Sequence, residues 1–216
     1  MALNTAIAQV GGSAEALSRR NRVYLAKIKQ LHGATAGDDL ARFRATVAIF
    51  RKYAPEYQFD TLMLMAQSYQ ESRLNQGAHS AVGAIGLMQL MAPTGAQMKV
   101  GDIHQAEANV HAGAKYMRHL MDVYFKDSRF DDQNRNLFAF AAYNAGPGRI
   151  HSLQKEAASQ GLNPNVWFDN VERICAVRVG QETTRYVRNI YKYYIAYTLI
   201  EQADAEKTRA KAKIAG

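Results

Sequence analysis

The 216-residue sequence has one cysteine, four prolines and no long hydrophobic run. A lone Cys175 excludes an internal disulfide framework and a cysteine-rich zinc site. Four prolines and 15 glycines are too few for a collagen-like or low-complexity chain. Because no apolar run reaches the roughly 18 residues of a membrane-spanning helix, we expect no transmembrane segment. The chain is long enough to bury a core without cross-links, which predicts one globular domain with short extensions.

Negative charge is scarce relative to positive charge. The chain has 27 Lys and Arg against 19 Asp and Glu, a net charge of +8. This excess favours encounter with nucleic acid, anionic lipid or anionic cell-wall polymer without choosing among them. Five basic residues lie within 19–29, where Tyr24 is the one aromatic neighbour. A nucleic-acid site needs more aromatic or base-reading partners, so we interpret this cluster as a solvated helix face and expect no nucleic-acid partner.

A secretory signal is also missing from the first residues. Residues 1–12 have no basic segment followed by an apolar stretch of about 7–15 residues. Three alternatives stay open: the protein remains inside the cell, it leaves by another route, or the sequence begins after processing or at an artificial boundary.

Hydrophobic spacing predicts helices almost throughout. Apolar residues recur every three or four positions from Leu40 to Tyr53, on a helix expected to end before Pro55. Asp60 is a candidate N-cap for a second helix, whose residues 62–66 are apolar all round and therefore expected at the domain centre.

Three more helices are expected further along the chain. One carries the apolar face Val110, Ala114, Met117, Leu120, Met121 and Tyr124. Residues 137–143 are apolar on every side and predict a central helix that stops at the turn 145–148. The last helix carries the stripe Tyr186, Ile190, Tyr193, Tyr194 and Tyr197, which we interpret as structural. No segment alternates with period two, so the prediction is an all-α fold with few or no short strands.

Several common catalytic motifs are absent. The sequence has no P-loop, no G-x-S-x-G, no H-E-x-x-H and no G-x-G-x-x-G. None of its six histidines pairs at i, i+4, so neither a metal nor a cofactor is expected. Cys175 lies among apolar neighbours and is interpreted as a small buried hydrophobe.

The segment 67–101 carries the chemistry. Five glycines punctuate it, with Ser80, Gln89 and Thr94 among apolar side chains. Glycine permits sharp turns and close approach of a ligand to the backbone. Such a wall suits a cleft that holds a polyhydroxylated substrate through amide and hydroxyl hydrogen bonds.

Glu71 is the only carboxylate from position 71 to position 101. It would lie near the C-terminus of an apolar helix, where the helix dipole and partial burial against Met65, Tyr69 or Tyr143 both raise the pKa of a carboxyl group. A carboxylic acid that is still protonated near neutral pH can act as the general acid of glycosidic cleavage. The alternative is an ordinary surface glutamate that caps the helix or pairs with Arg73.

Four ordered blocks resemble the soluble lytic transglycosylases, a family of peptidoglycan-cleaving enzymes. Residues 70–95 (QESRLNQGAHSAVGAIGLMQLMAPTG) are similar to its signature, a Glu-Ser pair followed by S-x-x-G-A-x-G-L-M-Q-L-M. The later blocks are 108–116 (ANVHAGAKY), 140–148 (FAAYNAGPG) and 181–190 (QETTRYVRNI). Residues 161–172 (GLNPNVWFDNVE) and the Tyr-rich last helix resemble the membrane-bound lytic transglycosylase F type most closely. The resemblance extends over about residues 53–197 and implies a lysozyme-like fold of the goose-type kind.

The resemblance also implies roles for single residues. Glu71 matches the catalytic acid/base of the family. The matched substrate-binding positions are Ser80, Gln89, Met91, Tyr143, Asn144 and Glu182. Core positions remain the alternative for Met91 and the preferred interpretation for Tyr186, and residues 146–148 are interpreted as a turn.

The family mechanism explains how one carboxylate can suffice, since ordinary glycosidases use two. In the family, the glutamate protonates the oxygen between MurNAc and GlcNAc. It then removes the proton of the MurNAc C6 hydroxyl, which closes a 1,6-anhydro ring. A hydrolytic muramidase on the same scaffold, and a noncatalytic wall-binding, virion or secretion-apparatus component, are the alternatives.

The resemblance further implies a place and an organisation for the chain. We expect peptidoglycan strands as the partner, a periplasmic or cell-envelope location, and a monomer. Residues 1–35 are expected to form an N-terminal extension that includes a partly basic helix, and 36–200 the catalytic domain. Residues 201–216 would form a polar tail, either a fraying helix or disordered. F-type relatives usually carry a further N-terminal domain that 216 residues cannot contain, so full length, truncation and a single-domain version stay open.

Overall fold

The computed structural model describes residues 37–127 and 129–215, so the basic cluster 19–29 and the whole of the expected extension, 1–35, lie outside the described residues. The described helices are α3 (Gly37–Glu56), α4 (Thr61–Ser72), α5 (Ala92–Met98), α6 (Ala106–Tyr124), α7 (Asp132–Ala145), α8 (Pro147–Ser159), α9 (Glu172–Arg178) and α10 (Gln181–Ala215). A short irregular turn, η1 (Trp167–Val171), precedes α9. In these two ranges, pairing of extended backbone is limited to isolated bridges at Ile85, which confirms the all-α prediction.

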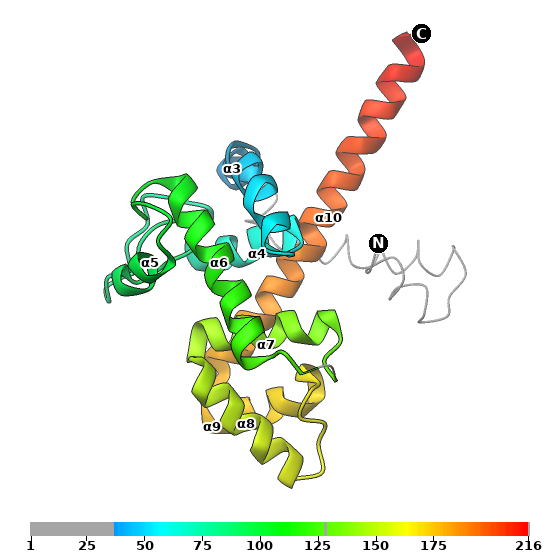
Figure 1. Ribbon diagram of the computed structural model, residues 1–216. Helices are drawn as coiled ribbons and strands as arrows, with labels where there is room; N and C mark the ends of the chain where they lie inside the picture. Colours follow the sequence, from blue (N-terminus) through cyan, green and yellow to red (C-terminus); the bar gives the residue numbers. More distant parts are fainter. Residues whose placement is uncertain (1–36, 128, 216) are drawn as a thin grey trace, which may run out of the picture.

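Helix α4 lies at the centre of the molecule, as its all-round apolar sequence predicts. The Asp60 side chain accepts a hydrogen bond from the Met63 N–H at 2.9 Å, which confirms the predicted N-cap. Residues 62–66 are all buried. They pack between α3 and α10, the long helix that crosses the molecule in Figure 1. The end of α4 is thereby held against elements from both halves of the chain.

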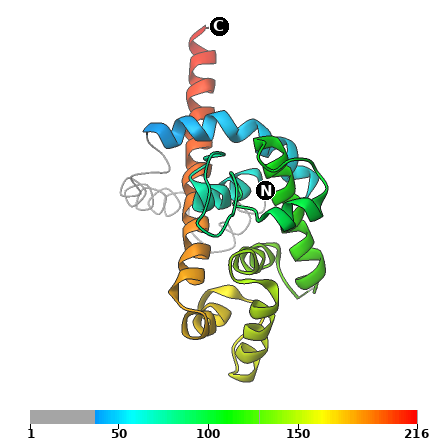
Figure 2. The same ribbon diagram turned by 90° about the vertical axis from the view of Figure 1, so that its left-hand side faces the viewer.

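Helix α10 buries its aromatic stripe against α4 and α7, as predicted. Tyr186, Ile190, Tyr194 and Tyr197 are buried, and Tyr193 packs edge-on against Tyr69 of α4. Residues 201–215 continue the same helix, and its last turns extend beyond the other described helices in both views (Figures 1 and 2). The structure thus describes residues 201–215 as a helix.

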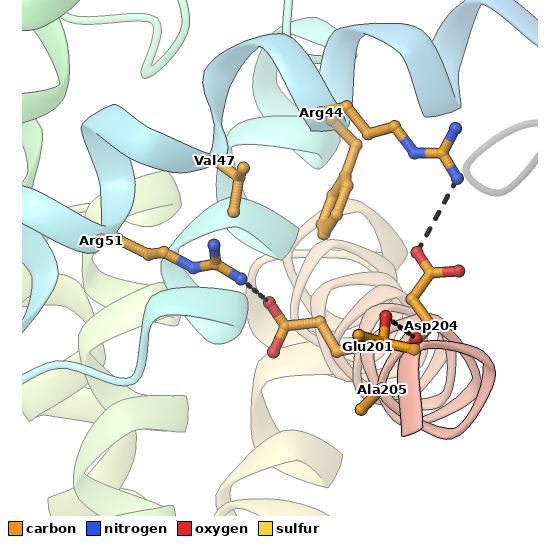
Figure 3. Close-up of a pocket in the computed structure, with 8 residues that line it drawn as sticks. Arg44, Val47, Arg51, Glu201, Asp204 and Ala205 are labelled. Carbon is orange, nitrogen blue, oxygen red and sulfur yellow. Dashed lines mark hydrogen bonds and ion pairs between the residues drawn. The ribbon is translucent and has the colours of Figure 1, made fainter. Parts of the chain in front are cut away.

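A groove of about 430 Å³ lies between α3 and the distal part of α10 (Figure 3). Two exposed ion pairs cross it, Arg51 to Glu201 at 2.6 Å and Arg44 to Asp204 at 3.7 Å. Such surface pairs contribute only about 0–1 kcal/mol each, so they add little to the stability of this contact. At about 1.5 Å per residue, Glu201 lies roughly 22 Å along α10 from Tyr186.

Three details of the helix predictions are wrong. Helix α3 continues through Pro55 to Glu56, because a proline in the last turn removes only one backbone hydrogen bond. Tyr124 is 42% exposed and does not belong to the apolar face of α6, since it is the last residue of that helix. Pro147 and Gly148 begin α8 after a break of one residue at Gly146, because proline is well suited to a first helical position.

Two other expectations concern single features of the described chain. Cys175 is buried and unpaired, and burial raises its thiol pKa to about 11, in agreement with a small buried hydrophobe. No helix within 37–127 and 129–215 is both long and apolar enough to cross a bilayer.

Candidate active site

Glu71 is the penultimate residue of α4, so its carboxyl group lies at the helix C-terminus as predicted. The helix ends because Arg73 adopts a left-handed conformation with φ of 56° and donates its backbone N–H to the Tyr69 carbonyl oxygen at 2.9 Å. The Arg73 guanidinium pairs with Asp39 of α3 at 2.7 Å. The alternative in which Arg73 pairs with Glu71 is therefore wrong.

Burial controls the ionisation of Glu71. The residue is partly buried, and burial of its carboxyl group raises its pKa to about 7. A hydrogen bond from Tyr186 acts in the opposite direction and is the weaker effect. Burial, and then the nearby charge of Glu71, hold the pKa of Tyr143 well above its usual range. Glu71 is thus a carboxyl group that can both hold and release a proton near neutral pH.

Tyr186 is a site residue that the sequence analysis assigned only to the core. Its ring is buried, as predicted, but its hydroxyl donates to Glu71 Oε1 at 2.5 Å. The same hydroxyl accepts a hydrogen bond from Gln67 Nε2 at 3.4 Å. Helical periodicity predicts which face of a helix is buried, but it does not predict the hydrogen-bond partner of a hydroxyl group at the end of a buried side chain. The contact between Tyr186 and Glu71 could therefore not be predicted from the sequence.

The loop between α4 and α5 is fixed to the end of α4 by two serines. Ser68 and Ser72 each donate a hydroxyl hydrogen bond to the Leu87 carbonyl oxygen, both at 2.9 Å. These residues flank Glu71, so the same few residues of α4 carry the candidate acid and hold the loop beside it. The loop faces the viewer in Figure 2, in front of α4.

Asn109 of α6 fixes the other side of this loop. Its buried amide donates from Nδ2 to the carbonyl oxygens of Ile85 and Ile103, both at 2.9 Å. Its Oδ1 accepts from the Met88 N–H at 2.8 Å. A buried amide donor or acceptor without a hydrogen-bond partner costs free energy. Here the Asn109 side chain forms hydrogen bonds with three backbone groups of the loop and its flanks. Asn109 lies in the second family-like block, but the sequence analysis assigned it no role.

At Gly86 the backbone of this loop lies close to the side chains of Asn109 and Gln76. Its φ is +78°, and a Cβ there would lie 2.5 Å from Asn109 Nδ2 and 2.7 Å from Gln76 Nε2. We expect Gly86→Ala to lower the free energy of unfolding by about 2 kcal/mol or more, from clash plus left-handed strain. Gly83→Ala is the control, because φ is +86° but nothing lies within 4 Å. Urea unfolding of both variants measures the difference, and equal losses would contradict a close approach at Gly86.

Ser80 and Gln89 lie in the loop, where their hydrogen bonds go to backbone groups. Ser80 Oγ accepts from the Ala84 N–H at 2.9 Å. Gln89 has a φ of 47° and donates from Nε2 to the carbonyl oxygens of Ala78 and Gly86 at 3.1 and 2.9 Å. The amide donors of Gln89 are thus used within the loop, and its Oε1 is the atom left for a ligand.

Tyr143 and Asn144 stand at the end of α7. The Tyr143 hydroxyl donates to the Met88 carbonyl oxygen at 2.7 Å, which joins α7 to the loop. Asn144 Oδ1 accepts from Thr183 Oγ1 at 2.7 Å, which joins α7 to the start of α10 and leaves Asn144 Nδ2 for a ligand. Hydrogen bonds between three of the family-like blocks, 70–95, 140–148 and 181–190, therefore hold the end of α7 in place.

The remaining predicted positions are exposed. Met91, at the N-cap of α5, is 42% exposed, so the core alternative for this residue is wrong. Glu182, in the first turn of α10, is exposed and next to Thr183. The structure brings the side chains of Glu71, Tyr143 and Tyr186 together from α4, α7 and α10. Within the described structure, Ser80, Gln89 and Met91 make no hydrogen bond to Glu71.

Metal-ligating residues do not gather in the part of the chain that the structure describes, where no group of three His, Cys, Asp or Glu side chains could hold an ion.

Comparison with known sequences finds a family match over most of the α-helical region. The family model of the transglycosylase SLT domain matches residues 48–165. The membrane-bound lytic murein transglycosylase F of Shewanella woodyi is 34% identical over 196 residues, which cover 82% of this chain and 40% of that protein. The same enzyme of Desulfosudis oleivorans is 35% identical over 172 residues, covering 72% and 36%. The chain thus spans about two fifths of the length of these relatives.

Comparison with solved structures gives the same fold. The 70 kDa soluble lytic transglycosylase of Escherichia coli aligns with a TM-score of 0.56 and 26% identity, over 70% of this chain and 24% of that one. The lytic transglycosylase Slt of Pseudomonas aeruginosa, solved as an inactive glutamate-to-glutamine mutant, aligns with a TM-score of 0.52 and 27% identity, over 74% and 24%. These alignments confirm the predicted lysozyme-like helical fold.

Proposed function

The chain belongs to the transglycosylase SLT family, and we propose that it is a peptidoglycan lytic transglycosylase in which Glu71 is the acid/base. The membership confirms the family resemblance described from the sequence, including its F-type character. One observation carries the assignment of Glu71: it is a partly buried carboxyl group whose pKa lies at about 7. The groups that act on this pKa, among the described residues, include no second carboxylate.

The two steps of the reaction need both protonation states of one group. Neutral Glu71 donates its proton to the oxygen between MurNAc and GlcNAc, and the bond from MurNAc C1 to that oxygen breaks. The resulting Glu71 carboxylate accepts the proton of the MurNAc C6 hydroxyl while O6 bonds to C1, which closes the 1,6-anhydro ring and restores neutral Glu71. Since the attacking oxygen belongs to the substrate, high effective molarity replaces an activated water.

A pKa near 7 suits this cycle because the same group must give and take a proton at one pH. The glutamate-to-glutamine mutant of the Pseudomonas aeruginosa relative is inactive, which supports a glutamate as the essential group in that protein. Here the amide and hydroxyl groups around Glu71 would bind the sugar. We propose contacts from Ser80, Gln89 Oε1 and Asn144 Nδ2, with Met91, Tyr143 and Glu182 lining the cleft.

The organisation and location of the protein follow from the same proposal. Residues 36–200 would form the catalytic domain, flanked by an N-terminal extension and a C-terminal tail. The partner would be the glycan strand of peptidoglycan, met by a monomer in the periplasm or cell envelope. The positive charge of residues 19–29, outside the described residues, would aid encounter with an anionic wall and take no part in the chemical step.

Mass spectrometry of fragments released from purified sacculi tests the proposal directly. A lytic transglycosylase releases fragments with 1,6-anhydroMurNAc ends. Reducing MurNAc ends would instead identify a hydrolytic muramidase. Release of no fragments, by folded protein that still binds sacculi, would identify a noncatalytic wall-binding component.

The pH dependence of cleavage is a further expected result. Glu71 must be protonated to begin the reaction, so kcat/KM should fall about tenfold per pH unit above pH 7. A profile measured on a soluble glycan oligomer, from pH 5 to pH 9, avoids the charge of the wall itself. A rate that is constant up to pH 9 would contradict Glu71 as the acid.

The stability of the protein gives an independent reading of the same pKa. The native state raises the Glu71 pKa from 4.5 to about 7, so it binds this proton more tightly than the unfolded chain does. The resulting stabilisation is complete below pH 4.5 and is lost as the pH rises through 7. The Glu71→Gln side chain cannot ionise. As the pH rises from 5 to 8, the free energy of unfolding of this variant should therefore increase by about 2–3 kcal/mol relative to that of the wild type.

A further inference from the structure

Gln67 is a buried polar residue of α4 that no step above requires. It lies one helical turn before Glu71 and has no exposed surface. Its Nε2 donates to the Tyr186 hydroxyl at 3.4 Å and contacts Met117 Sδ at 3.5 Å. Its Oε1 is buried and has no hydrogen-bond partner among the described residues. An apolar side chain of the same size would avoid the cost of that empty acceptor.

We propose that Gln67 is a positioning residue that turns the Tyr186 hydroxyl proton toward Glu71 Oε1, so that the acid proton of Glu71 is carried on Oε2. This inference rests on the proposed function, because it concerns the same acid. It explains why a glutamine with an unsatisfied carbonyl occupies a site that a methionine or leucine could fill.

The donor and acceptor groups fix the direction of these hydrogen bonds. The Nε2 of glutamine can only donate, so the Tyr186 oxygen must accept there. The one proton of the Tyr186 hydroxyl is then directed to its other neighbour, Glu71 Oε1 at 2.5 Å. Because Oε1 accepts this hydrogen bond, the dissociable proton of Glu71 belongs on Oε2.

The titratable groups that face this pair keep the arrangement stable. Tyr143 of α7 and Tyr186 of α10 face Glu71, and burial holds both hydroxyl pKa values well above the usual range. Tyr116 of α6 faces Tyr143 across 5.4 Å, and burial also raises its pKa. Since all three tyrosines stay protonated at working pH, Glu71 is the group of this cluster whose titration shapes the rate.

Three variants test the inference through the alkaline limb of the pH profile. Tyr186→Phe removes a hydrogen bond to the carboxylate, so the midpoint should rise by about one pH unit. Gln67→Met leaves the hydroxyl free to turn and less polarised, so the midpoint should rise by about 0.3 unit. Because Gln67 acts through Tyr186, the double variant should match Tyr186→Phe alone.

A matched substitution separates positioning from packing. Gln154→Met replaces another buried glutamine, whose Nε2 donates to the Pro164 carbonyl oxygen at 2.9 Å. It should lower the melting temperature and leave the pH profile unchanged. Gln67→Met should shift the profile without lowering the melting temperature, since it removes an unsatisfied acceptor. Gln67→Leu is the second variant and should behave in the same way.

Clear outcomes would overturn the inference. It fails if Gln67→Met and Gln67→Leu keep the wild-type midpoint, if the shift persists in the Tyr186→Phe background, or if both variants only lose stability. Glu71→Gln is measured in parallel. If Glu71→Gln is inactive while the Gln67 substitutions leave the midpoint of the pH profile unchanged, only this inference is wrong. An active Glu71→Gln would instead contradict the proposed function itself.

Discussion

Glu71→Gln is expected to lower glycan cleavage by at least about a hundredfold and up to about ten thousandfold, the range that general acid–base catalysis contributes. The loss should fall in the upper part of that range, because the same carboxyl group serves both proton transfers of the proposed reaction. Release of anhydro fragments from sacculi, measured as initial rate per folded protein, is the readout.

The substitution is close to isosteric and should preserve the fold. The Tyr186 hydroxyl can donate to a glutamine carbonyl as it does to Glu71 Oε1 at 2.5 Å. No ion pair of Glu71 is lost, since Arg73 pairs with Asp39. The expected increase in stability above pH 7 would show that the inactive variant is fully folded.

Glu201→Gln is the matched control for this experiment. Glu201 lies in the groove of Figure 3, where it pairs with Arg51 at 2.6 Å. It lies far along α10 from the contact with Glu71, so its loss should leave the cleavage rate unchanged. Retention of a tenth of the wild-type rate by Glu71→Gln, on the same sacculi, would show that Glu71 is not the acid/base.

The position of Glu71 could be predicted because it depends on local sequence. Asp60 caps the helix, the apolar run 62–66 buries it, and Glu71 lies near its C-terminus, as expected from the glycine-rich segment that follows. The raised pKa was expected from the helix dipole and from partial burial of Glu71 at this position. The direction of the shift is confirmed, and burial is its cause.

The surroundings of Glu71 could not be predicted in the same way. The contact with Tyr186 joins residues 115 positions apart, and Asn109 reaches Ile85 across 24 positions. Periodicity reports the buried face of each helix, but the packing angle between helices decides which buried hydroxyl or amide meets which partner. Gln67 was passed over for the same reason, since one polar residue in an apolar helix has no periodic signal.

Tyr197 tests the other part of the prediction, that the stripe of α10 is structural. Its ring is fully buried, 4.6 Å from the ring of Phe43 on α3 and 6.2 Å from that of Tyr69 on α4. It therefore joins the three helices that hold Glu71 at its place, several turns beyond Tyr186 on the same helix. Its hydroxyl is buried without a hydrogen-bond partner among the described residues.

Tyr197→Ala should lower the free energy of unfolding by about 3–5 kcal/mol, the usual cost of truncating a buried aromatic side chain. Tyr197→Phe keeps the ring and removes only the unpaired hydroxyl, so it should be neutral or stabilising by about 1 kcal/mol. Urea unfolding of the two variants separates ring from hydroxyl. Since Tyr197 lies outside the site, cleavage per folded molecule should stay at the wild-type level in both. An alanine variant as stable as the wild type would mean that the stripe does not hold α10 in place, and a destabilised phenylalanine variant would mean that the hydroxyl is hydrogen-bonded, for example to water.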